Sequence, residues 1–359
     1  MNAPPLGVAV VGAGADHWSG LAHIPAITAS GDLRLRRLVT SSPASALAAA
    51  RRWEVDATHE LDPVLDDDTV DIVVVTVRVA HHAEIVAAAI AAGKHVYCEW
   101  PLALDPAQAE ELAALSDGRP DRVHLTGLQG RFSPWLRAAG RLLAGGGIGR
   151  PLTAGLRLFL PHGLMARPAH RAHLRHRGAA ANVLSIQGGH TLDMLGTVLG
   201  VPRVDAARMW SAVPEFLTDT GERLPRDAPD NLVAVLDYDG VVAVTQFSQT
   251  APNESFELEI LGTDGKLRLA GTGQPQFGRL TLDITPFGSR TSEVVEPLSA
   301  AALPGEHPGH NVALAYAAMV AAIRDEPARV PLPDFRAAVN LHELLGVIAS
   351  RAVDSTVNA

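Results

Sequence analysis

The sequence predicts an α/β domain with a parallel, doubly wound sheet, followed by an α+β domain with a largely antiparallel, open sheet. Up to about residue 126, continuous apolar runs alternate with helical stretches, and such runs are typical of parallel strands buried on both faces. Beyond that point, short strand-like stretches follow one another with turn signals between them, which favours antiparallel pairing. We therefore predict two domains, residues 1–126 and 127–359.

Composition agrees with two globular domains and excludes several classes of protein. The 359 residues are 47% hydrophobic with a formal net charge of -9, which argues against nucleic-acid binding because that needs a basic face. Cys98 is the one cysteine in the sequence, so an internal disulfide framework and a multi-cysteine zinc site are excluded. We see no secretory signal, and no apolar run approaches the roughly 20 residues that cross a bilayer. We expect a cytoplasmic protein without a membrane partner.

The first predicted strand, residues 6–11, stops at the glycine pair Gly12 and Gly14. Glycines here allow a tight turn and let backbone amides approach a pyrophosphate at the start of the next helix. His17 stands where a third glycine is usual, and Gly20 comes next, as though residues 16–19 were inserted into the loop. A purely structural turn would use the same glycines, so the prediction of a dinucleotide site depends on what surrounds them.

Strands and helices continue to alternate through the first domain. We predict further strands over residues 33–39, 71–77 and 96–98, and helices over residues 20–29, 44–52, 82–92 and 105–115. Parallel strands joined by right-handed helical crossovers form the Rossmann architecture, which binds dinucleotides at the carboxyl ends of its strands. The sequence therefore predicts a dinucleotide-binding domain.

The residues after the second strand bear on the choice of nicotinamide cofactor. An acidic side chain there would accept a hydrogen bond from the ribose 2′-hydroxyl of NAD. This chain has Thr40, Ser41 and Ser42 instead, and hydroxyls do not repel a 2′-phosphate, so the sequence favours NADP over NAD. The serines are also suited to cap the helix that begins near Pro43, and the two roles are compatible.

The second domain is predicted from six strand-like stretches. They cover residues 153–160, 204–210, 232–238, 241–248, 256–261 and 267–270, and hairpin-turn signals lie at residues 237–240 and 263–265. Helices are expected over residues 136–143, 183–199, 310–323 and 334–352. This order of elements indicates an α+β domain whose sheet packs on helices with one face.

Residues 161–177 are rich in histidine and arginine. His170, His173 and His176 have a spacing that would place them on one helical face, which suggests a metal site. We expect no metal, because no cysteine or carboxylate lies among them and the neighbouring arginines would repel a cation. A basic loop over the cofactor or an anionic substrate is favoured, and a solvated loop remains an equal alternative.

The predicted helix 183–199 carries a polar trio. Gln187, His190 and Asp193 lie on one side of it, away from a leucine stripe on the other. Apolar neighbours such as Met194 turn toward the same side, so the trio is expected to be partly enclosed. A histidine in such a place is often a core residue with satisfied hydrogen bonds, whereas Asp193 is also suited to orient the His190 ring for proton transfer.

Several motifs together resemble the glucose-fructose oxidoreductase, inositol dehydrogenase and MocA (GFO/IDH/MocA) family. The motifs are the glycine loop, HIPA at 23–26, HAEI at 82–85, AAGKHVYCE at 91–99, QGRF at 129–132 and GHTLD at 189–193. The resemblance implies a nicotinamide cofactor, NAD or NADP, a small sugar-like substrate held between the domains, and oligomerisation through the open sheet. We therefore expect a homodimer or a larger homo-oligomer.

The resemblance also implies roles for individual residues. The cofactor-binding residues would be Gly12, Gly14, Ser41, Ser42, Thr76, His82, Glu99 and Arg131. His190 matches the family's substrate-contacting histidine and would act as acid or base with Asp193, while Glu99 would shape the pocket. The family has Glu-Lys-Pro where this chain has Glu99-Trp100-Pro101, and the family's lysine contacts substrate and nicotinamide. Trp100 would instead offer an apolar wall.

The sequence supports two hypotheses about the function. The favoured one is an NAD(P)-dependent oxidoreductase that transfers hydride to or from a carbon bearing oxygen or nitrogen. Several stretches, including LQGRFSPWLRA at 128–138, are similar to the branch of the family that contains the fungal galactose-pathway repressor. That repressor binds nicotinamide cofactor and a transcriptional activator instead of turning over a sugar, so a catalytically silent regulator is the alternative. Another redox-assisted reaction, such as an elimination, would need the same cofactor.

Overall fold

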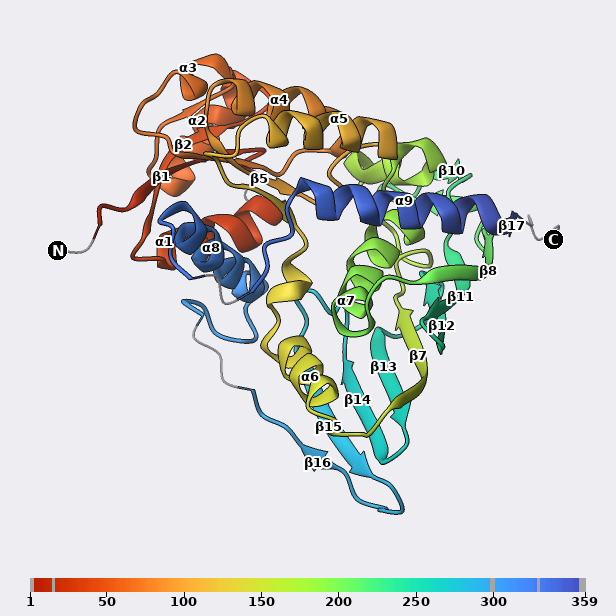
Figure 1. Cartoon of the computed structure of the whole chain (residues 1–359). Helices are drawn as coiled ribbons and strands as arrows, with labels where there is room; N and C mark the ends of the chain where they lie inside the picture. The colour runs from red at the N-terminus through yellow and green to blue at the C-terminus, as the bar shows by residue number, and fades with distance from the viewer. Residues whose placement is uncertain (1–2, 15–16, 298–300, 328–329, 355–359) are drawn as a thin grey trace. The chain divides into compact units, whose positions relative to one another are not determined.

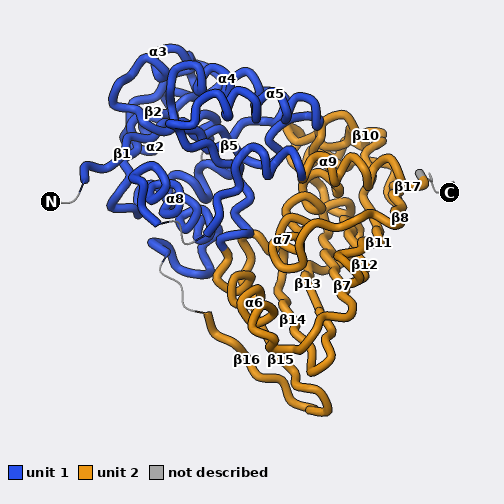
Figure 2. The backbone as a smooth tube through the Cα atoms, in the orientation of Figure 1, with its two compact units in different colours: residues 1–132, 300–340 blue, residues 133–299, 341–359 orange. Residues whose placement is uncertain are grey.

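The computed structural model describes residues 3–14, 17–297, 301–327 and 330–354. The chain divides into two compact units, unit 1 with residues 1–132 and 300–340 and unit 2 with residues 133–299 and 341–359 (Figure 2). The predicted domains differ from these units in two respects, because residues 127–132 and 300–340, predicted in the second domain, group with unit 1. Residues 300–340 do so because α8 (His310–Ile323) contributes Val312, Tyr316 and Met319 to the core of unit 1.

Unit 1 is built on a parallel six-stranded sheet in the order β3-β2-β1-β4-β5-β6. The strands are β1 (Leu6–Val11), β2 (Leu33–Val39), β3 (Ala57–Thr58), β4 (Ile72–Val75), β5 (His95–Glu99) and β6 (His124–Gly127). The chain moves outward from β1 in both directions, so the strand order reverses between β1 and β4, where such sheets bind their ligands. The prediction of a doubly wound sheet is confirmed, although β3 and β6 were not predicted.

Helices cover both faces of this sheet (Figure 1). They are α1 (Ile24–Ala29), α2 (Pro43–Trp53), α3 (Asp62–Leu65), α4 (His82–Ala91) and α5 (Pro106–Asp117), in addition to α8. Alternate strand residues such as Val8, Val10 and Val74 share a core with α1, α2 and α8. The residues between them, such as Ala9 and Val73, are equally buried. Burial on both faces explains why the strands are apolar without interruption.

Unit 2 contains a nine-stranded sheet in the order β16-β15-β14-β13-β7-β12-β11-β8-β17. Its strands are β7 (Pro151–Phe159), β8 (Arg203–Trp210), β11 (Asn231–Tyr238), β12 (Val241–Ser248), β13 (Ser255–Gly262), β14 (Gly265–Gly271), β15 (Leu280–Pro286), β16 (Glu293–Val294) and β17 (Ala352–Asp354). Neighbours are antiparallel except for the pairs β7 with β12 and β8 with β17. The prediction of a largely antiparallel sheet is therefore confirmed, and β15, β16 and β17 are additions to it. A separate ribbon pairs β9 (Glu215–Leu217) with β10 (Arg223–Pro225).

The β11–β12 hairpin shows how local sequence sets the register of this sheet. Asp239 and Gly240 both have positive φ, 52° and 90°, as a two-residue hairpin turn of the primed type requires. The Asp237 carboxylate accepts a hydrogen bond from the Gly240 amide at 2.7 Å. Along β11 buried and half-buried residues alternate, so the turn presents one face of the hairpin to the core.

The helices of unit 2 are α6 (Pro134–Ala144), α7 (Gly189–Leu199) and the C-terminal part of α9 (Phe335–Arg351). The helix predicted over residues 183–199 is α7 preceded by a π-helical turn, Val183–Gly188, in which Asn182 accepts hydrogen bonds from the Leu184 and Ser185 amides. The helix predicted to end at Ala352 ends at Arg351, since Ala352 already pairs with β8.

Apolar and charged side chains share the half-exposed face of the nine-stranded sheet. Val242, Val244 and Leu261 are exposed there, and Glu257 pairs with Arg157 and Arg268 from neighbouring strands. The homo-oligomer expected on this face stays a prediction.

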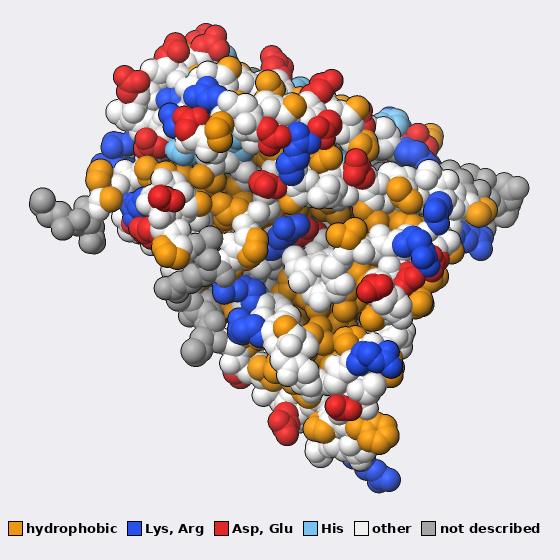
Figure 3. Space-filling model, in the orientation of Figure 1, with side chains coloured by type: hydrophobic (Ala, Val, Ile, Leu, Met, Phe, Trp, Pro, Cys, Tyr) orange, Lys and Arg blue, Asp and Glu red, His pale blue; other side chains and the backbone are white. Residues whose placement is uncertain are grey.

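In the described part of the chain, no helix combines the length and apolarity needed to cross a membrane. On the visible surface of unit 1, acidic and basic side chains are interspersed (Figure 3).

Candidate functional site

The carboxyl ends of the parallel strands gather the predicted cofactor-binding residues of unit 1 at one edge of its sheet. Gly12 follows β1, Thr76 follows β4, Glu99 ends β5 and Gly127 ends β6. Parallel strands deliver all their carboxyl ends to the same edge, which is why residues so far apart in sequence meet here. A Cβ added at Gly127 would lie 2.5 Å from Glu99 Oε1, so β6 approaches the Glu99 carboxylate as closely as a glycine allows.

The glycine loop has a backbone that only glycine adopts readily. Gly12 has φ of 98°, and a Cβ there would lie 2.9 Å from the Thr76 hydroxyl. Ser19, which lies in the predicted insertion, is buried, and its hydroxyl donates to the Gly12 carbonyl at 2.8 Å. Thr76 donates to the Val11 carbonyl at 2.8 Å. The loop is therefore fixed from two sides, with the open cradle that close approach of a pyrophosphate requires.

The second glycine is less strictly required. A Cβ added at Gly14 would lie 2.6 Å from the His17 ring, but that ring belongs to an exposed side chain, and Gly14, unlike Gly12, has no positive φ. We therefore expect Gly12 to tolerate a larger residue less well than Gly14.

Ser41 and Ser42, which follow β2, differ in their surroundings. Ser42 is the N-cap of α2: its hydroxyl accepts from the Ser45 amide at 3.2 Å, and the Ser45 hydroxyl accepts from the Ser42 amide at 3.1 Å. The capping alternative is thus confirmed for Ser42. Ser41 is exposed just before it, so Ser41 is the hydroxyl with room to contact a ribose or its phosphate.

A buried polar cluster, which we call the His23 cluster, joins His23, Glu99 and Tyr316. His23 is fully buried, with Nε2 3.0 Å from Glu99 Oε1 and Nδ1 2.7 Å from the Tyr316 hydroxyl. A carboxylate only accepts hydrogen bonds, so the proton lies on Nε2 and Tyr316 donates to Nδ1. Tyr97 packs edge-on against the His23 ring at 5.1 Å between centroids. This chain of donors fixes the position of Glu99.

The tyrosines of the cluster stay protonated. Burial raises the pKa of Tyr316 well above its usual value, and the nearby Glu99 charge adds to the effect. The same two causes, burial first, raise the pKa of Tyr97. The Tyr316 hydroxyl therefore remains a donor across the physiological pH range.

His82 and the Glu99-Trp100-Pro101 turn are tied together. The Trp100–Pro101 peptide is cis, and Trp100 is buried. His82 Nδ1 lies 2.9 Å from the Pro101 carbonyl oxygen and Nε2 lies 3.1 Å from that of Val77. Burial lowers the pKa of His82, and a neutral ring donates to only one of the two carbonyls at a time. His82 thus links the end of β4 to the turn that carries Trp100, and its predicted cofactor contact stays a prediction.

Arg131 lies in a short helical turn, Gln129–Phe132, directly after β6, and is half-buried. This position follows the carboxyl end of a strand that neighbours Glu99. Arg131 therefore lies at the edge of the sheet where the cofactor is expected, and its contact with the cofactor stays a prediction.

The predicted acid/base residues belong to unit 2. His190 and Asp193 lie three positions apart on α7, so they share a side of that helix, and both are buried. Gln187, in the π-helical turn before them, accepts from Gln249 Nε2 at 3.0 Å. The prediction that the polar trio is enclosed is confirmed, and the catalytic roles of His190 and Asp193 stay predictions.

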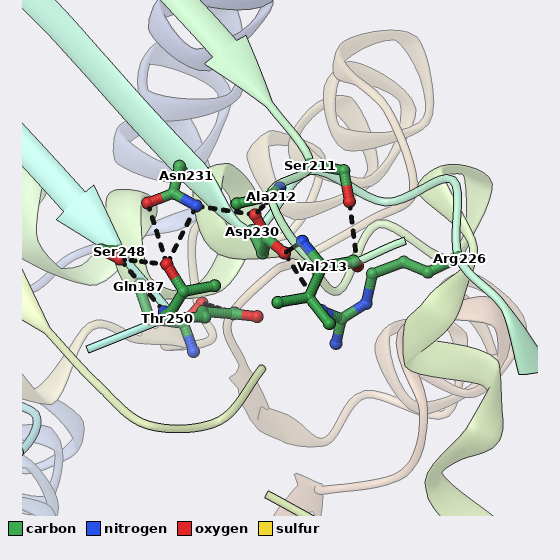
Figure 4. A network of polar contacts seen from close by, with 10 residues as sticks. Gln187, Ser211, Ala212, Val213, Arg226, Asp230, Asn231, Ser248 and Thr250 are labelled. Carbon is green, nitrogen blue, oxygen red and sulfur yellow. Dashed lines mark hydrogen bonds and ion pairs between the residues drawn. The ribbon is translucent and has the colours of Figure 1, made fainter. Parts of the chain in front are cut away.

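The basic segment predicted over residues 161–177 lines a cavity of about 380 Å³ within unit 2. The cavity is bordered by His162, Arg167 and Arg171 from this segment, and by Gln187, Arg226 and Gln249. Behind it, Arg226 reaches Asp230, whose carboxylate also accepts from the Ala212 and Val213 amides (Figure 4). In the part of the chain that the structure describes, no group of three potential ligands is arranged to hold a metal ion.

Sequence reasoning missed two residues of these sites. His23 was noted within a motif but given no role, because its partners Glu99 and Tyr316 are 76 and 293 positions away. Arg226 was not singled out, since it lies in a loop without a recognisable pattern. A buried histidine and a buried arginine leave no periodicity in the sequence, and only the fold reveals what they face.

The comparisons with known proteins agree with the fold. Residues 6–126 match the oxidoreductase family with an NAD-binding Rossmann fold, and residues 136–268 match the GFO/IDH/MocA C-terminal domain. The dehydrogenase aclE of Aspergillus oryzae is 30% identical over 303 residues, covering 80% of this chain and 82% of that protein. The chain thus contains a domain of the NAD-binding Rossmann type. It belongs to the GFO/IDH/MocA family of oxidoreductases.

Other relatives include both a regulator and an enzyme. The galactose/lactose metabolism regulatory protein GAL80 of Saccharomyces cerevisiae is 26% identical over 308 residues, 78% of this chain and 70% of that protein. A super-repressor mutant of the same protein has a solved structure with a TM-score of 0.84 at 23% identity, covering 97% of this chain and 95% of that chain. A levoglucosan dehydrogenase solved with NADH and levoglucosan gives 0.81 at 20% identity, covering 97% of each chain. At these identities the two structures show a shared fold.

Proposed function

We propose that this protein is an NAD(P)-dependent oxidoreductase that transfers hydride to or from a carbon bearing oxygen or nitrogen on a small, sugar-like molecule. The observation that carries the proposal is the cradle at Gly12, where a positive φ and the close Thr76 hydroxyl leave room for no side chain. Family membership and the dehydrogenases among the relatives support it.

The cofactor would be held by Gly12 and Gly14 at its pyrophosphate and by Ser41 at its adenosine ribose. When bound, it supplies the hydride acceptor or donor. The absence of an acidic residue after β2 favours NADP over NAD. Dissociation constants for NADP and NAD, measured by quenching of tryptophan fluorescence, test this preference, and clearly tighter NAD binding would reverse it.

We assign proton transfer to His190. Hydride transfer to a carbonyl creates an alkoxide that needs a proton, and the indole of Trp100 has neither a full charge nor an easily lost proton. Asp193 would hold the His190 tautomer, Glu99 would shape the pocket from its fixed place beside His23, and Trp100 would form an apolar wall. A positioned acid or base is worth roughly two to four orders of magnitude in rate.

The alternative is a catalytically silent NAD(P)-binding regulator. Two observations favour it: Trp100 stands where the family has lysine, and GAL80 is among the relatives. Such a protein would bind the cofactor through the same glycine loop and would contact another protein instead of turning over a sugar.

A single set of assays separates the two functions. NAD(P)H absorbance is followed with a panel of sugars, polyols, keto compounds and cyclic imines, using wild type, His190→Ala and Trp100→Lys. We expect wild-type turnover with at least one compound and a loss of roughly 10²- to 10⁴-fold in His190→Ala. Turnover that survives His190→Ala would remove the acid/base role but leave the enzyme. Turnover in none of the proteins, or only in Trp100→Lys, would favour the regulator.

We further propose a cytoplasmic homo-oligomer assembled through the half-exposed sheet face of unit 2. Light scattering on the purified chain measures its mass directly, and Val244→Lys, which places a charge on that face, is expected to shift it toward the monomer. A wild-type chain that scatters as a monomer at micromolar concentration would contradict this part of the proposal.

A further inference from the structure

The cavity of unit 2 concentrates positive charge. Its border includes the guanidinium groups of Arg167, Arg171 and Arg226, together with His162. Arg167 and Arg171 come from one chain segment and Arg226 from the loop after β10 (Arg223–Pro225), so the fold brings these cations together from two places. A volume of about 380 Å³ lies within the range of small-molecule pockets.

The one carboxylate that contacts these arginines is already shared among other donors. Asp230 accepts from the Ala212 amide at 2.8 Å, the Val213 amide at 2.9 Å and Asn231 Nδ2 at 2.7 Å. Arg226 reaches the same carboxylate at a longer 3.4 Å, as Figure 4 shows. Among the described residues, no ion pair joins Arg167 or Arg171 to an acidic side chain. The cavity therefore keeps an excess of positive charge.

Holding these cations together costs free energy in the unliganded protein. Burial lowers the pKa of Arg167, and the neighbouring Arg171 and Arg226 lower it further. Burial also lowers the pKa of His162 to about 4, with Arg167 and Arg171 adding to the effect. The arginines still remain charged near neutral pH, whereas His162 is neutral. An anion would relieve this repulsion, since like charges are tolerated in proteins mainly where a ligand or counter-ion balances them.

The rest of the border suits a hydroxylated small molecule. Gln187 and Gln249 hydrogen-bond to each other at 3.0 Å and still have unused donor and acceptor capacity. Phe216 lies under Arg226, 5.8 Å from the guanidinium carbon to the ring centroid, which orients that guanidinium. Carboxylate and phosphate oxygens match the planar fork of arginine better than hydroxyl groups do.

We propose that this cavity binds the oxyanion group, carboxylate or phosphate, of a small molecule, so that the substrate is a sugar acid or a sugar phosphate and not a neutral sugar. The identification of that molecule as a substrate rests on the proposed oxidoreductase function, whereas its binding does not. The cavity holds the oxyanion through Arg171 and Arg167, and Gln187 and Gln249 meet its hydroxyl groups.

The test compares matched ligands on the full-length chain. Calorimetric titrations with glucuronate, glucose 6-phosphate, inorganic phosphate and glucose are run on wild type, Arg171→Gln and Arg175→Gln. Arg175 is the matched control, because it lies in the same short helix, Ala169–Arg175, and donates to the Pro225 carbonyl outside the cavity border. We expect wild type to bind at least one sugar anion about tenfold or more tighter than glucose, with Arg171→Gln removing that preference and Arg175→Gln retaining it.

Two results would overturn the inference: equal affinity of wild type for glucose and both sugar anions, or a preference that Arg171→Gln leaves unchanged. Binding of inorganic phosphate as tight as that of glucose 6-phosphate would reduce the site to a free-phosphate site and overturn the substrate assignment. Should Arg171→Gln fail to fold, the wild-type preference alone decides. Turnover of a neutral sugar with no anion preference defeats this inference and spares the proposed function. Arginine-dependent anion binding by a protein that turns over none of the tested compounds keeps the anion-binding site and defeats the proposed oxidoreductase function.

Discussion

The His23 cluster in unit 1, which is buried, and the arginine cavity in unit 2, where Arg167 and Arg171 are half-buried, handle polar groups in opposite ways. In the His23 cluster each group satisfies the next: Tyr316 donates to His23, and His23 donates to Glu99. In the cavity, Arg167 and Arg171 border open volume without a carboxylate partner among the described residues. Buried polar groups are normally paired, so the first arrangement is complete by itself and the second is completed by a ligand.

This difference indicates which region stabilises the fold and which region binds a ligand. A closed polar chain stabilises the fold and fixes a side chain, as Glu99 is fixed at the end of β5. An open group of like charges lowers stability until an ion of opposite charge arrives. Substitutions in the two regions should therefore differ in what they change: stability in the first region, ligand affinity in the second.

The largest expected effect is on stability in His23→Leu. This change leaves the Glu99 carboxylate and the Tyr316 hydroxyl without their buried partner, and leaving a buried charged acceptor without its donor costs about 3 kcal/mol or more. Urea unfolding measures the loss. Arg171→Gln, which breaks no ion pair, should change the free energy of unfolding by less than about 0.5 kcal/mol. Similar losses in both variants would erase the distinction between the two regions.

Tyr316→Phe refines the same comparison. It removes one hydrogen bond to His23 and keeps the ring that packs against Tyr97 at 5.2 Å between centroids. We expect a loss of about 1 kcal/mol in the same urea experiment, well below that of His23→Leu. A loss as large as that of His23→Leu would mean that the Tyr316 hydroxyl, and not the pair with Glu99, dominates the cluster.

The next prediction distinguishes the two units by the ligand that each binds, NAD(P) in unit 1 and a sugar anion in unit 2. Gly12→Val fills the cradle beneath Thr76 and forces a β-branched residue to a φ of 98°, so NAD(P) affinity should fall by about 100-fold or more. Gly14→Val, where the nearest atoms belong to an exposed side chain and the φ is not positive, should lose less. Binding of glucuronate or glucose 6-phosphate in unit 2 should persist in both. Unchanged NAD(P) affinity in Gly12→Val would mean that the cofactor does not approach this loop.

Much of the fold was predictable because local sequence determines it. The bounds of β1, β2, β12 and α8 coincide with their predicted ranges, since continuous or helical apolar periodicity marks them. β6 was missed because His124, Thr126 and Gly127 interrupt its apolar pattern, although all four of its residues are buried. β17 was missed because the chain leaves α9 and pairs with β8 without any turn residue.

The candidate sites were predictable only in part, for a different reason. Gly12 and Gly14 were predictable from the sequence because a requirement on the backbone restricts which residue type each single position accepts. The arginines of residues 161–177 also stood out as a basic segment with an anionic ligand among its interpretations. Arg226 and the His23 cluster depend on contacts between distant segments, so nothing in the local sequence marks them.

Two histidines with equally low pKa values extend the comparison to pH. Burial lowers the pKa of His95 in unit 1 to about 4, and Arg122 and His124 add to the effect while Asp71 and Asp121 oppose it. Its Nδ1 accepts from the Val123 amide at 2.9 Å, so the ring is neutral in the folded chain. Since the unfolded value is near 6.5, the unfolded chain takes up the proton first as the pH falls.

The contribution of His95 to stability is therefore full above about pH 6.5 and is lost progressively as the pH falls to about 4. The slope is at most about 1.4 kcal/mol per pH unit for one proton. His95→Asn keeps an acceptor for Val123 and cannot titrate, so its stability relative to wild type should rise over this window. Parallel curves for the two proteins in urea unfolding at pH 7 to 4 would contradict the role of His95.

The smallest expected effect distinguishes His162 from His95. His162 faces Arg167 and Arg171 across the cavity, and an oxyanion held by those arginines would favour the protonated ring. Its titration midpoint, followed by NMR of the ring protons, should rise by about one pH unit or less in saturating glucose 6-phosphate. His95 belongs to unit 1 and is not among the residues that line the cavity, so it should titrate unchanged. A shift of both midpoints would indicate a general salt effect, whereas a shift of neither would place the anion outside the cavity, since a charge beside His162 necessarily changes its pKa.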